Sequence, residues 1–283
     1  MKTLVTGANG QLGQCLKKQS AKFPELKLQF FSSAELDITN SEKVNEIFKD
    51  GNYEWCINCA AYTNVEKAEI EKEKAFLVNA KGAKNIAEAC SSNGVKLIHI
   101  STDYVFDGEK PSAYVEEDKV NPINVYGASK LKGEEYIQQT LAEYFILRTS
   151  WLYSEFGHNF FNTMLRKANE ENCVLKITTE QKGTPTNAND LAEGVLQIIS
   201  KEKTAYGIYH FSNEGQATWY DFAKSIFTNA THLDKVELIA SNEYKTQAKR
   251  PSNSILSKKK MKNDLGFKIP TWQESLAELQ KSI

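Results

Sequence analysis

Tyr126 and Lys130 are the residues of this 283-residue chain whose types and spacing most directly suggest chemistry. They begin and end the run Tyr126-Gly-Ala-Ser-Lys130, so on a helix they share one face, one turn apart. A nearby ammonium favours the phenolate, so we expect Lys130 to lower the pKa of Tyr126 from about 10. The pair then predicts a proton donor and acceptor near neutral pH. A chance pair on an ordinary helix is the alternative.

A glycine-rich loop near the N-terminus predicts a cofactor for this pair. Residues 2–6 have the character of a short strand, and Gly7, Gly10 and Gly13 follow before an amphipathic run. In a strand–loop–helix unit, Gly7 permits the tight turn, Gly10 admits a pyrophosphate and Gly13 lets the helix pack closely. The helix N-terminus adds free N–H groups and a positive dipole end. We expect a dinucleotide here; a glycine turn without a ligand is the alternative.

The end of the second predicted strand, residues 26–31, bears on the choice of cofactor. An acidic residue there would bind the ribose hydroxyls of NAD, but Ser32-Ser33 occupies the place. Hydroxyl groups tolerate a 2′-phosphate, so NADP is favoured. Asp37 lies either near the adenine or beside a helix cap formed by Thr39 or Asn40.

Two further strand ends place small and polar residues where ligands lie in a doubly wound sheet. Ala60, Ala61 and Thr63 follow the strand at residues 55–59, and Ser101-Thr102-Asp103 follows the strand at residues 95–100. His99, within that last strand, is expected to be a core or helix-facing histidine rather than a general base. Asn79, on the apolar stripe of a helix at residues 73–92, is either a partner of the site or a core amide.

These elements predict an α/β fold: a doubly wound (Rossmann) parallel sheet with a smaller C-terminal substrate-binding lobe. We expect an NADP-binding domain over residues 1–150. Residues 151–283 should form mainly the substrate lobe, with segments that return to the main sheet.

Composition narrows the class of protein. The net charge of −1 lacks the basic excess of a nucleic-acid binder. No apolar run approaches the ~20 residues of a membrane span. An odd count of five cysteines suits a reducing cytoplasm. Cys56 and Cys59 have the spacing of a metal or redox pair, but on a strand they point to opposite faces, so buried cysteines are expected.

Four motifs resemble the extended short-chain dehydrogenase/reductases in order and spacing. They are Thr6-Gly-Ala-Asn-Gly-Gln-Leu-Gly13, Asn58-Cys-Ala-Ala-Tyr-Thr-Asn-Val65, Ser101-Thr-Asp-Tyr-Val-Phe-Asp-Gly108 and Tyr126-Gly-Ala-Ser-Lys130. Later motifs are similar to the dTDP-4-dehydrorhamnose reductase family: Arg148-Thr-Ser-Trp-Leu-Tyr153, Gly157-His-Asn-Phe160 and Gln181-Lys-Gly-Thr-Pro-Thr186. The resemblance covers essentially the whole chain.

This resemblance implies reduction of the C4 keto group of a dTDP-4-dehydro-6-deoxy sugar by NADPH, with NADH as a possible substitute. Tyr126 would protonate the alkoxide, Lys130 would hold the nicotinamide ribose, and Thr102 would bind the keto oxygen. Asp103, Trp151 and Arg250 would contact the substrate, although Trp151 has a packing anchor as its alternative. The implied cofactor-binding residues are Gly7, Gly10, Gln11, Leu12, Gly13, Ser32, Asp37, Ile38, Ala60, Ala61, Thr63, Tyr126 and Lys130.

Two departures refine these implications. The sugar-nucleotide 4,6-dehydratases carry Asp-Glu after the threonine, whereas Asp103 is followed here by Tyr104, which favours reduction without dehydration. Some relatives bind Mg²⁺ at a dimer contact, at a place that holds Cys15 here, a poor ligand for that ion. A bound metal is therefore not expected. A homodimer is one possible oligomeric state. The alternatives are a related sugar-nucleotide 4-ketoreductase or epimerase, or a non-catalytic NADP-binding regulatory subunit.

Overall fold

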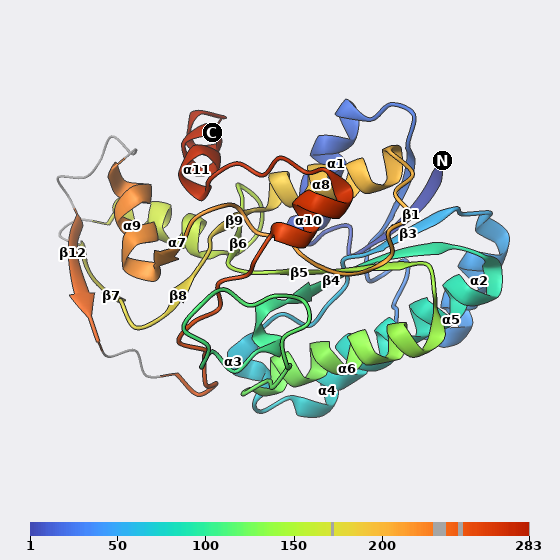
Figure 1. Cartoon of the computed structure of the whole chain (residues 1–283), viewed down its shortest axis with the longest axis horizontal. Coiled ribbons are helices and arrows are strands. Elements are labelled where there is room, and N and C mark those ends of the chain that lie inside the picture. Colours follow the sequence, from blue (N-terminus) through green and yellow to red (C-terminus); the bar gives the residue numbers. More distant parts are fainter. Residues whose placement is uncertain (171–172, 229–235, 243–245, 283) are drawn as a thin grey trace.

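The structure is a computed structural model that describes residues 1–170, 173–228, 236–242 and 246–282. A six-stranded parallel sheet in the order β2-β1-β3-β4-β5-β10 forms its centre (Figure 1). These strands are β1 (Lys2–Thr6), β2 (Lys27–Phe31), β3 (Trp55–Asn58), β4 (Lys96–Thr102), β5 (Tyr144–Thr149) and β10 (Gly207–His210).

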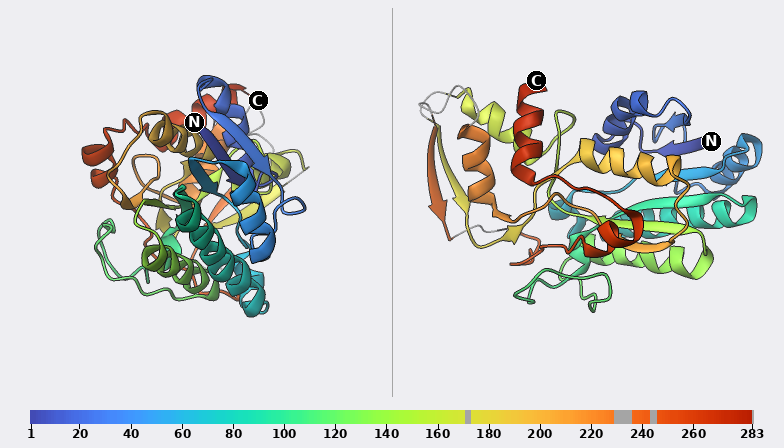
Figure 2. Two further views of the ribbon diagram at one scale, coloured as in Figure 1. Left: turned by 90° about the vertical axis from the view of Figure 1, so that its right-hand side faces the viewer. Right: turned by 45° about the horizontal axis from the view of Figure 1, so that its top comes forward.

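Helices cover both faces of this sheet, as a parallel sheet requires (Figure 2). One side carries α1 (Gln11–Gln19), α8 (Ala188–Ser200) and α10 (Lys259–Leu265); the other carries α2 (Ser41–Gly51), α5 (Ala83–Asn93) and α6 (Val125–Thr140). The chain leaves β1 for β2 and later returns to β3 on the other side of β1. Ligands bind at such a switch point, beyond the carboxyl ends of the strands. The predicted doubly wound fold is confirmed.

Alternate residues of the strands enter two separate cores. Val5, Ile57 and Ile98 pack beneath α1 and α8, while Cys56 packs beneath α2 and α5. Cys59 contacts the first of these cores, so Cys56 and Cys59 lie on opposite faces. Burial raises the pKa of both thiols. Cys56 is buried as predicted, whereas Cys59 is half-buried.

The helix predicted over residues 73–92 is present but interrupted. It runs as α4 (Lys72–Phe76), a π-helical segment η2 (Leu77–Gly82) and then α5. A π-helical turn re-aims the side chains that it carries, and such turns occur often at functional sites. Asn79 lies within this segment.

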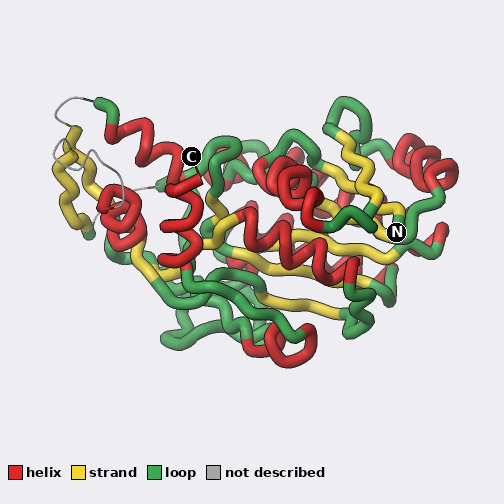
Figure 3. The backbone as a smooth tube through the Cα atoms, turned by 90° about the horizontal axis from the view of Figure 1, so that it is seen from above, coloured by secondary structure: helices red, strands yellow, loops and turns green. Residues whose placement is uncertain are grey.

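The remaining elements form short connections and a C-terminal lobe at one end of the main sheet, away from the N-terminus (Figure 3). The lobe core joins α7, α9 and α11 with the β7–β12 pair. The elements not yet given are η1 (Ser20–Lys22), α3 (Val65–Ala68), η3 (Asp103–Val105), β6 (Leu152–Tyr153), α7 (Phe160–Ala168), β7 (Cys173–Thr178), β8 (Lys182–Gly183), β9 (Thr186–Asn187), β11 (Ala217–Thr218), α9 (Trp219–Thr228), β12 (Val236–Ser241) and α11 (Trp272–Ser282).

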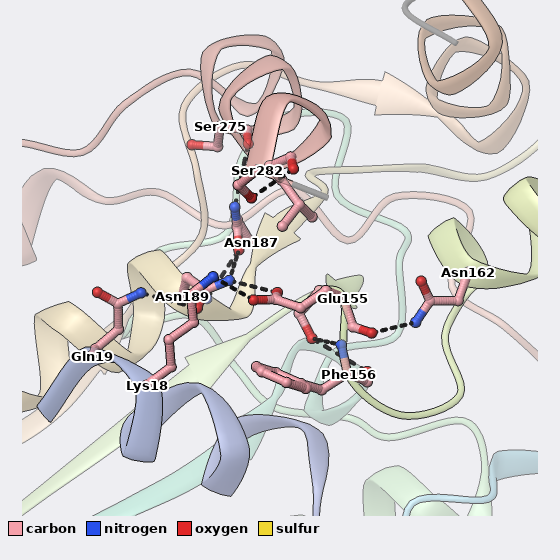
Figure 4. Close-up of polar contacts among 11 residues, drawn as sticks. Lys18, Gln19, Glu155, Phe156, Asn162, Asn187, Asn189, Ser275 and Ser282 are labelled. Atoms are coloured by element: carbon pink, nitrogen blue, oxygen red, sulfur yellow. Dashed lines mark hydrogen bonds and ion pairs between the residues drawn. The ribbon is translucent and has the colours of Figure 1, made fainter. Parts of the chain in front are cut away.

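A polar network joins the lobe to the first helix (Figure 4). Lys18 in α1 forms an ion pair with Glu155, with 2.6 Å between Nζ and Oε1. Asn189 in α8 donates to the other Glu155 oxygen at 2.9 Å and accepts from Gln19 Nε2 at 3.0 Å. Residues 155, 189 and 18–19 are thereby fixed together at the C-terminal end of α1. In the described part of the chain, no helix is long and apolar enough to cross a membrane.

Candidate active site

The glycine loop has the geometry of a dinucleotide cradle. Gly7 adopts φ +69°, and a Cβ there would lie 2.8 Å from the Ala60 nitrogen at the end of β3. A Cβ on Gly13 would lie 2.4 Å from the Gly7 carbonyl oxygen, which explains the need for glycine. Gly10 caps α1 without a side-chain hydrogen bond, and the first turn of α1 holds no acidic residue. The helix N-terminus is therefore electrostatically suited to a pyrophosphate.

The other predicted cofactor residues surround this loop in different ways. Leu12 and Ile38 are buried in the two cores, so they can offer only backbone atoms to a ligand. Gln11 Oε1 accepts a hydrogen bond from Asn159 at 3.0 Å. Asp37 accepts from the Thr39 nitrogen and hydroxyl at 2.9 and 2.8 Å.

The last members of the set follow the carboxyl end of β3. Ala60 and Ala61 are half-buried and Thr63 is exposed. Asn40, rather than Thr39, caps α2, with its Oδ1 accepting from the Lys43 nitrogen at 3.0 Å. One of the two capping residues considered from the sequence is thus identified.

Glu35 is a residue that sequence reasoning missed at the end of β2. Its Oε2 accepts hydrogen bonds from the Ser32 nitrogen at 2.8 Å and from the Ser32 hydroxyl at 2.7 Å. These hydrogen bonds lower the pKa of Glu35 and keep it ionised. A carboxylate therefore does stand beside Ser32, although three residues later than the usual position. The spacing of Ser32 and Glu35 is that of a capping box, which was the available signal.

The helix that carries Tyr126 and Lys130 is held by close backbone contacts. Asn124 caps α6, and its Oδ1 accepts from the Gly127 nitrogen at 2.8 Å. A Cβ on Gly127 would lie 2.1 Å from the Tyr104 carbonyl oxygen, so only glycine lets α6 approach η3 this closely. Gly133 likewise faces the Asn79 carbonyl oxygen, which would lie 2.3 Å from a Cβ.

Thr102, Asp103 and Tyr126 come together at the carboxyl end of β4. Thr102 Oγ1 donates to Asp103 Oδ1 at 3.0 Å and accepts from the Tyr104 nitrogen at 3.2 Å. Burial raises the pKa of Asp103 to about 6. Burial also raises the pKa of Tyr126 to about 12, with a hydrogen bond to Thr102 acting in the opposite direction. The Tyr126 side chain nevertheless remains partly exposed.

The predicted effect of Lys130 on Tyr126 is wrong in this structure. Lys130 Nζ donates to the Ile100 carbonyl at 2.7 Å and lies 3.2 Å from His99 Nε2. The ammonium is thus engaged by β4, and desolvation rather than a nearby charge dominates the pKa of Tyr126. Burial lowers the pKa of Lys130 itself to about 8.

A buried ion pair lies one helical turn beyond Lys130. Glu134 accepts from Arg148 NH2 at 2.7 Å and from Arg148 Nε at 3.0 Å, and it also accepts from the Ser101 hydroxyl. The exposed fractions of the Arg148 and Glu134 side chains are 3% and 0%. Three elements, β4, β5 and α6, are fixed together by this contact.

Asn79 proves to be a fully bonded amide that supports the site. Its Oδ1 accepts from the Tyr62 nitrogen at 2.8 Å, and its Nδ2 donates to the Tyr62 carbonyl and to Ser129 Oγ, both at 2.9 Å. Ser129 in turn donates to the Tyr126 carbonyl at 2.8 Å. Asn79 therefore fixes the loop after β3 to helix α6, which carries Tyr126 and Lys130. It is a buried core amide with all its partners, and it also supports the predicted site.

Arg250 reaches the site from the C-terminal part of the chain. Its guanidinium forms an ion pair with Glu66 and contacts the Tyr104 hydroxyl at 3.3 Å. Asn124 Nδ2 donates to the neighbouring Lys249 carbonyl at 2.9 Å, which fixes this segment to the start of α6. Local sequence patterns could not predict this ion pair, because Glu66 and Arg250 are 184 residues apart.

Trp151 is part of an aromatic stack. It has a φ of +46°, which is unusual for a bulky residue. Its ring lies 3.7 Å from the Trp219 ring, at an interplanar angle of 6°. Gly183 makes room for this ring, since a Cβ there would lie 2.5 Å from it. Trp151 therefore does act as a packing anchor within the chain, while its contact with the substrate stays a prediction.

Comparison with known proteins agrees with this geometry. The family described as RmlD substrate binding domain matches residues 1–283. A dTDP-4-dehydrorhamnose reductase from Sinorhizobium fredii is 40% identical over 288 residues, which cover 99% of this chain and 96% of that protein. Another from Aggregatibacter actinomycetemcomitans is 40% identical over 290 residues, covering 98% and 97%.

A solved structure of a dTDP-4-dehydrorhamnose reductase from Bacillus anthracis in complex with NADP superposes with a TM-score of 0.94. It is 39% identical and covers 100% of this chain and 99% of that one. An orthologue from Clostridium acetobutylicum gives the same TM-score at 40% identity, with the same coverage.

Proposed function

The chain belongs to the RmlD substrate binding domain family, and we propose that it reduces dTDP-4-dehydro-L-rhamnose to dTDP-L-rhamnose with NADPH. The observation that carries this proposal is the contact of Tyr126 with Thr102 at the carboxyl end of β4, with Lys130 one turn further along α6 and the glycine loop at the end of β1. Tyr104 stands where a dehydratase needs a second carboxylate, so the site supports reduction alone.

NADPH, when bound, supplies the hydride that reduces C4 of the sugar. The α1 N-terminus and the loop Gly7–Gly13 would hold its pyrophosphate, with Ala60, Ala61 and Thr63 beside the nicotinamide half. The Bacillus anthracis relative contains NADP, which supports this assignment. Ser32, which is hydrogen-bonded to Glu35, would lie next to the adenosine ribose.

Tyr126 would donate the proton that neutralises the alkoxide formed at C4. Its pKa of about 12 keeps the phenol protonated at neutral pH, which is the form that a proton donor needs. Thr102 would donate to the same oxygen and so orient the keto group. Lys130, as an ammonium, would stabilise the phenolate left behind and bind the nicotinamide ribose.

The substrate side would use Arg250 for the diphosphate, because its planar guanidinium suits bidentate binding of phosphate oxygens. Glu66 now occupies that guanidinium, so the diphosphate must replace or share the contact. Asp103 and Trp151 would border the sugar and nucleotide. A homodimer stays a prediction, and Cys15, a buried thiol whose pKa burial raises to about 12, does not suit Mg²⁺.

The direct test follows NADPH absorbance with purified dTDP-4-dehydro-L-rhamnose and identifies the sugar nucleotide formed. We expect dTDP-L-rhamnose and one NADPH consumed per product. Parallel reactions with other 4-keto sugar nucleotides provide the specificity control. Turnover of one of those, without turnover of dTDP-4-dehydro-L-rhamnose, would overturn the proposal.

A further inference from the structure

A row of polar side chains crosses the main sheet and ends at Lys130. Thr6, Asn58 and His99 are register partners on the adjacent strands β1, β3 and β4. Thr6 Oγ1 lies 2.7 Å from Asn58 Oδ1, and Asn58 Nδ2 lies 3.1 Å from His99 Nδ1. His99 Nε2 then lies 3.2 Å from Lys130 Nζ. The exposed fraction of each of the four residues is 2% or less.

We propose that His99 is a positioning residue that holds the Lys130 amino group in the site and adapts to both of its protonation states. The inference rests on the proposed function, because it gives Lys130 a role in the reaction. Its basis is geometric: each ring nitrogen of His99 contacts one polar partner, and both contacts are shielded from water. A histidine kept only for packing needs no such pair of partners.

Two hydrogen-bond patterns fit these atoms with a neutral imidazole. In the first, the Lys130 ammonium donates to Nε2, Nδ1–H donates to the Asn58 oxygen, and the Asn58 amide nitrogen points to Thr6. In the second, Thr6 donates to Asn58 Oδ1, Asn58 Nδ2 donates to Nδ1, and Nε2–H donates to a neutral Lys130 amine. Rotation of one amide and a change of tautomer interconvert the two patterns.

The charges around the pair favour a neutral ring. Burial and the Lys130 charge hold the pKa of His99 well below its usual range. Glu134 on α6 and Cys59 after β3 act on Lys130, and Glu134 is itself paired with Arg148 on β5. Asp103 and Tyr126 are titratable groups near the carboxyl end of β4. His99 thus stabilises the Lys130 ammonium by accepting a hydrogen bond, without adding a second positive charge.

The first test compares pH–rate profiles of the NADPH-saturated enzyme with and without this acceptor. His99→Leu removes the acceptor, so the pKa of Lys130 falls and the basic limb of kcat moves to lower pH by about one unit. His99→Gln places an amide near the Nε2 position. The basic limb of kcat should then return most of the way to its wild-type pH. His210→Gln is the matched control, since His210 is equally buried on β10 but is bonded to the Tyr114 carbonyl. An unchanged limb in His99→Leu would overturn the proposal.

The second test does not depend on turnover. The chain has four histidines, so ¹⁵N NMR of the NADP-bound protein, with His99→Gln for assignment, can follow the two ring nitrogens of His99. We expect a neutral ring that changes from Nδ1–H to Nε2–H as the pH rises through the titration of Lys130, near pH 8. A single tautomer across that range, or a charged ring, would contradict the proposal. Failure to reduce the sugar would instead refute the proposed function and leave this readout intact.

Discussion

Around Gly7–Gly13 the chain offers backbone atoms to a ligand, whereas around Arg250 it offers side chains that already bind one another. The proposed cofactor half needs glycine because a Cβ on Gly13 would lie only 2.4 Å and 2.7 Å from the carbonyl oxygens of Gly7 and Ala8. The proposed substrate half consists of Arg250 with its partners Glu66 and Tyr104, and of the Trp151–Trp219 stack. A backbone cradle is ready before its ligand arrives, but a paired guanidinium must exchange partners.

This difference implies distinct responses to mutation. Changes in the cofactor half should alter the affinity for NADPH without altering that for the sugar nucleotide. Changes in the substrate half should do the reverse. Tyr126 and Thr102 contact each other at the carboxyl end of β4 and should affect mainly turnover.

Tyr126→Phe should produce the largest effect, because it removes the proton donor and leaves both halves intact. We expect kcat to fall by about 10²–10⁴-fold, the usual contribution of general acid catalysis. Isothermal titration with NADPH should give an affinity close to that of the wild type. An equal loss of NADPH affinity would show that Tyr126 is structural. Turnover and cofactor binding would then not depend on separate residues.

Asp103→Asn tests the buried carboxyl group that accepts a hydrogen bond from Thr102. Because folding raises the pKa of Asp103 from 3.8 to about 6, its protonated form stabilises the fold at low pH. That contribution is fully present below the unfolded pKa and is lost as the pH rises through 6. Between pH 4 and pH 7, wild type should therefore lose as much as ~3 kcal/mol more unfolding free energy than the variant. Urea unfolding at both pH values measures this, and equal losses would contradict the assignment.

Gly13→Ala tests the backbone cradle directly. The new methyl group would overlap the Gly7 and Ala8 carbonyl oxygens, so the loop must shift at a cost of about 1–3 kcal/mol. We expect weaker NADPH binding with unchanged binding of the substrate nucleotide, dTDP, in calorimetry. Lys17→Ala, on an exposed position of the same helix, is the control. Loss of dTDP binding as well would show that the two halves are not independent.

Arg250→Ala tests the opposite half. Removal of a charge-assisted contact to the diphosphate should raise KM for the sugar nucleotide about tenfold, at little cost to NADPH affinity. Lys249→Ala, at the exposed neighbouring residue, should leave KM unchanged. Glu66→Gln adds a second check: it removes the negative charge that pairs with Arg250 and should lower KM slightly. A normal KM in Arg250→Ala would move the diphosphate site elsewhere.

Glu35→Gln should give the smallest effect, since it alters an exposed charge that borders the proposed cofactor half through Ser32. The Glu35 carboxylate beside Ser32 repels a 2′-phosphate, so its neutralisation should raise the preference for NADPH over NADH by a few-fold. Ratios of kcat/KM for the two cofactors measure this, with Glu42→Gln as the control. A shift toward NADH would mean that Glu35 assists the phosphate indirectly.

The backbone of the glycine loop was the part that the sequence predicted best. Strand, glycine loop and helix are adjacent in the chain, so local backbone rules were enough to place Gly7, Gly10 and Gly13. The Thr218–Asp221 capping box and the Asn40 cap were predictable for the same reason. The substrate half was less predictable, because the Arg250–Glu66 pair joins residues that only the fold brings together.

The electrostatics of the centre also required the structure. Sequence spacing placed Lys130 beside Tyr126, but it could not show that Ile100 and His99 already engage the ammonium. Nor could it show the desolvation that dominates the pKa of Tyr126. The row Thr6–Asn58–His99 depends on strand register across β1, β3 and β4, which no local pattern specifies.

The stacked pair Trp151–Trp219 gives the protein an internal optical label. Two indoles at 3.7 Å and nearly parallel share their excited states, so they should absorb and emit as a coupled unit rather than as separate rings. The chain has four tryptophans, and the other two lie apart in the sheet and in the lobe, at Trp55 and Trp272. Near-ultraviolet circular dichroism would therefore report whether a nucleotide that reaches this corner leaves the pair together or separates it.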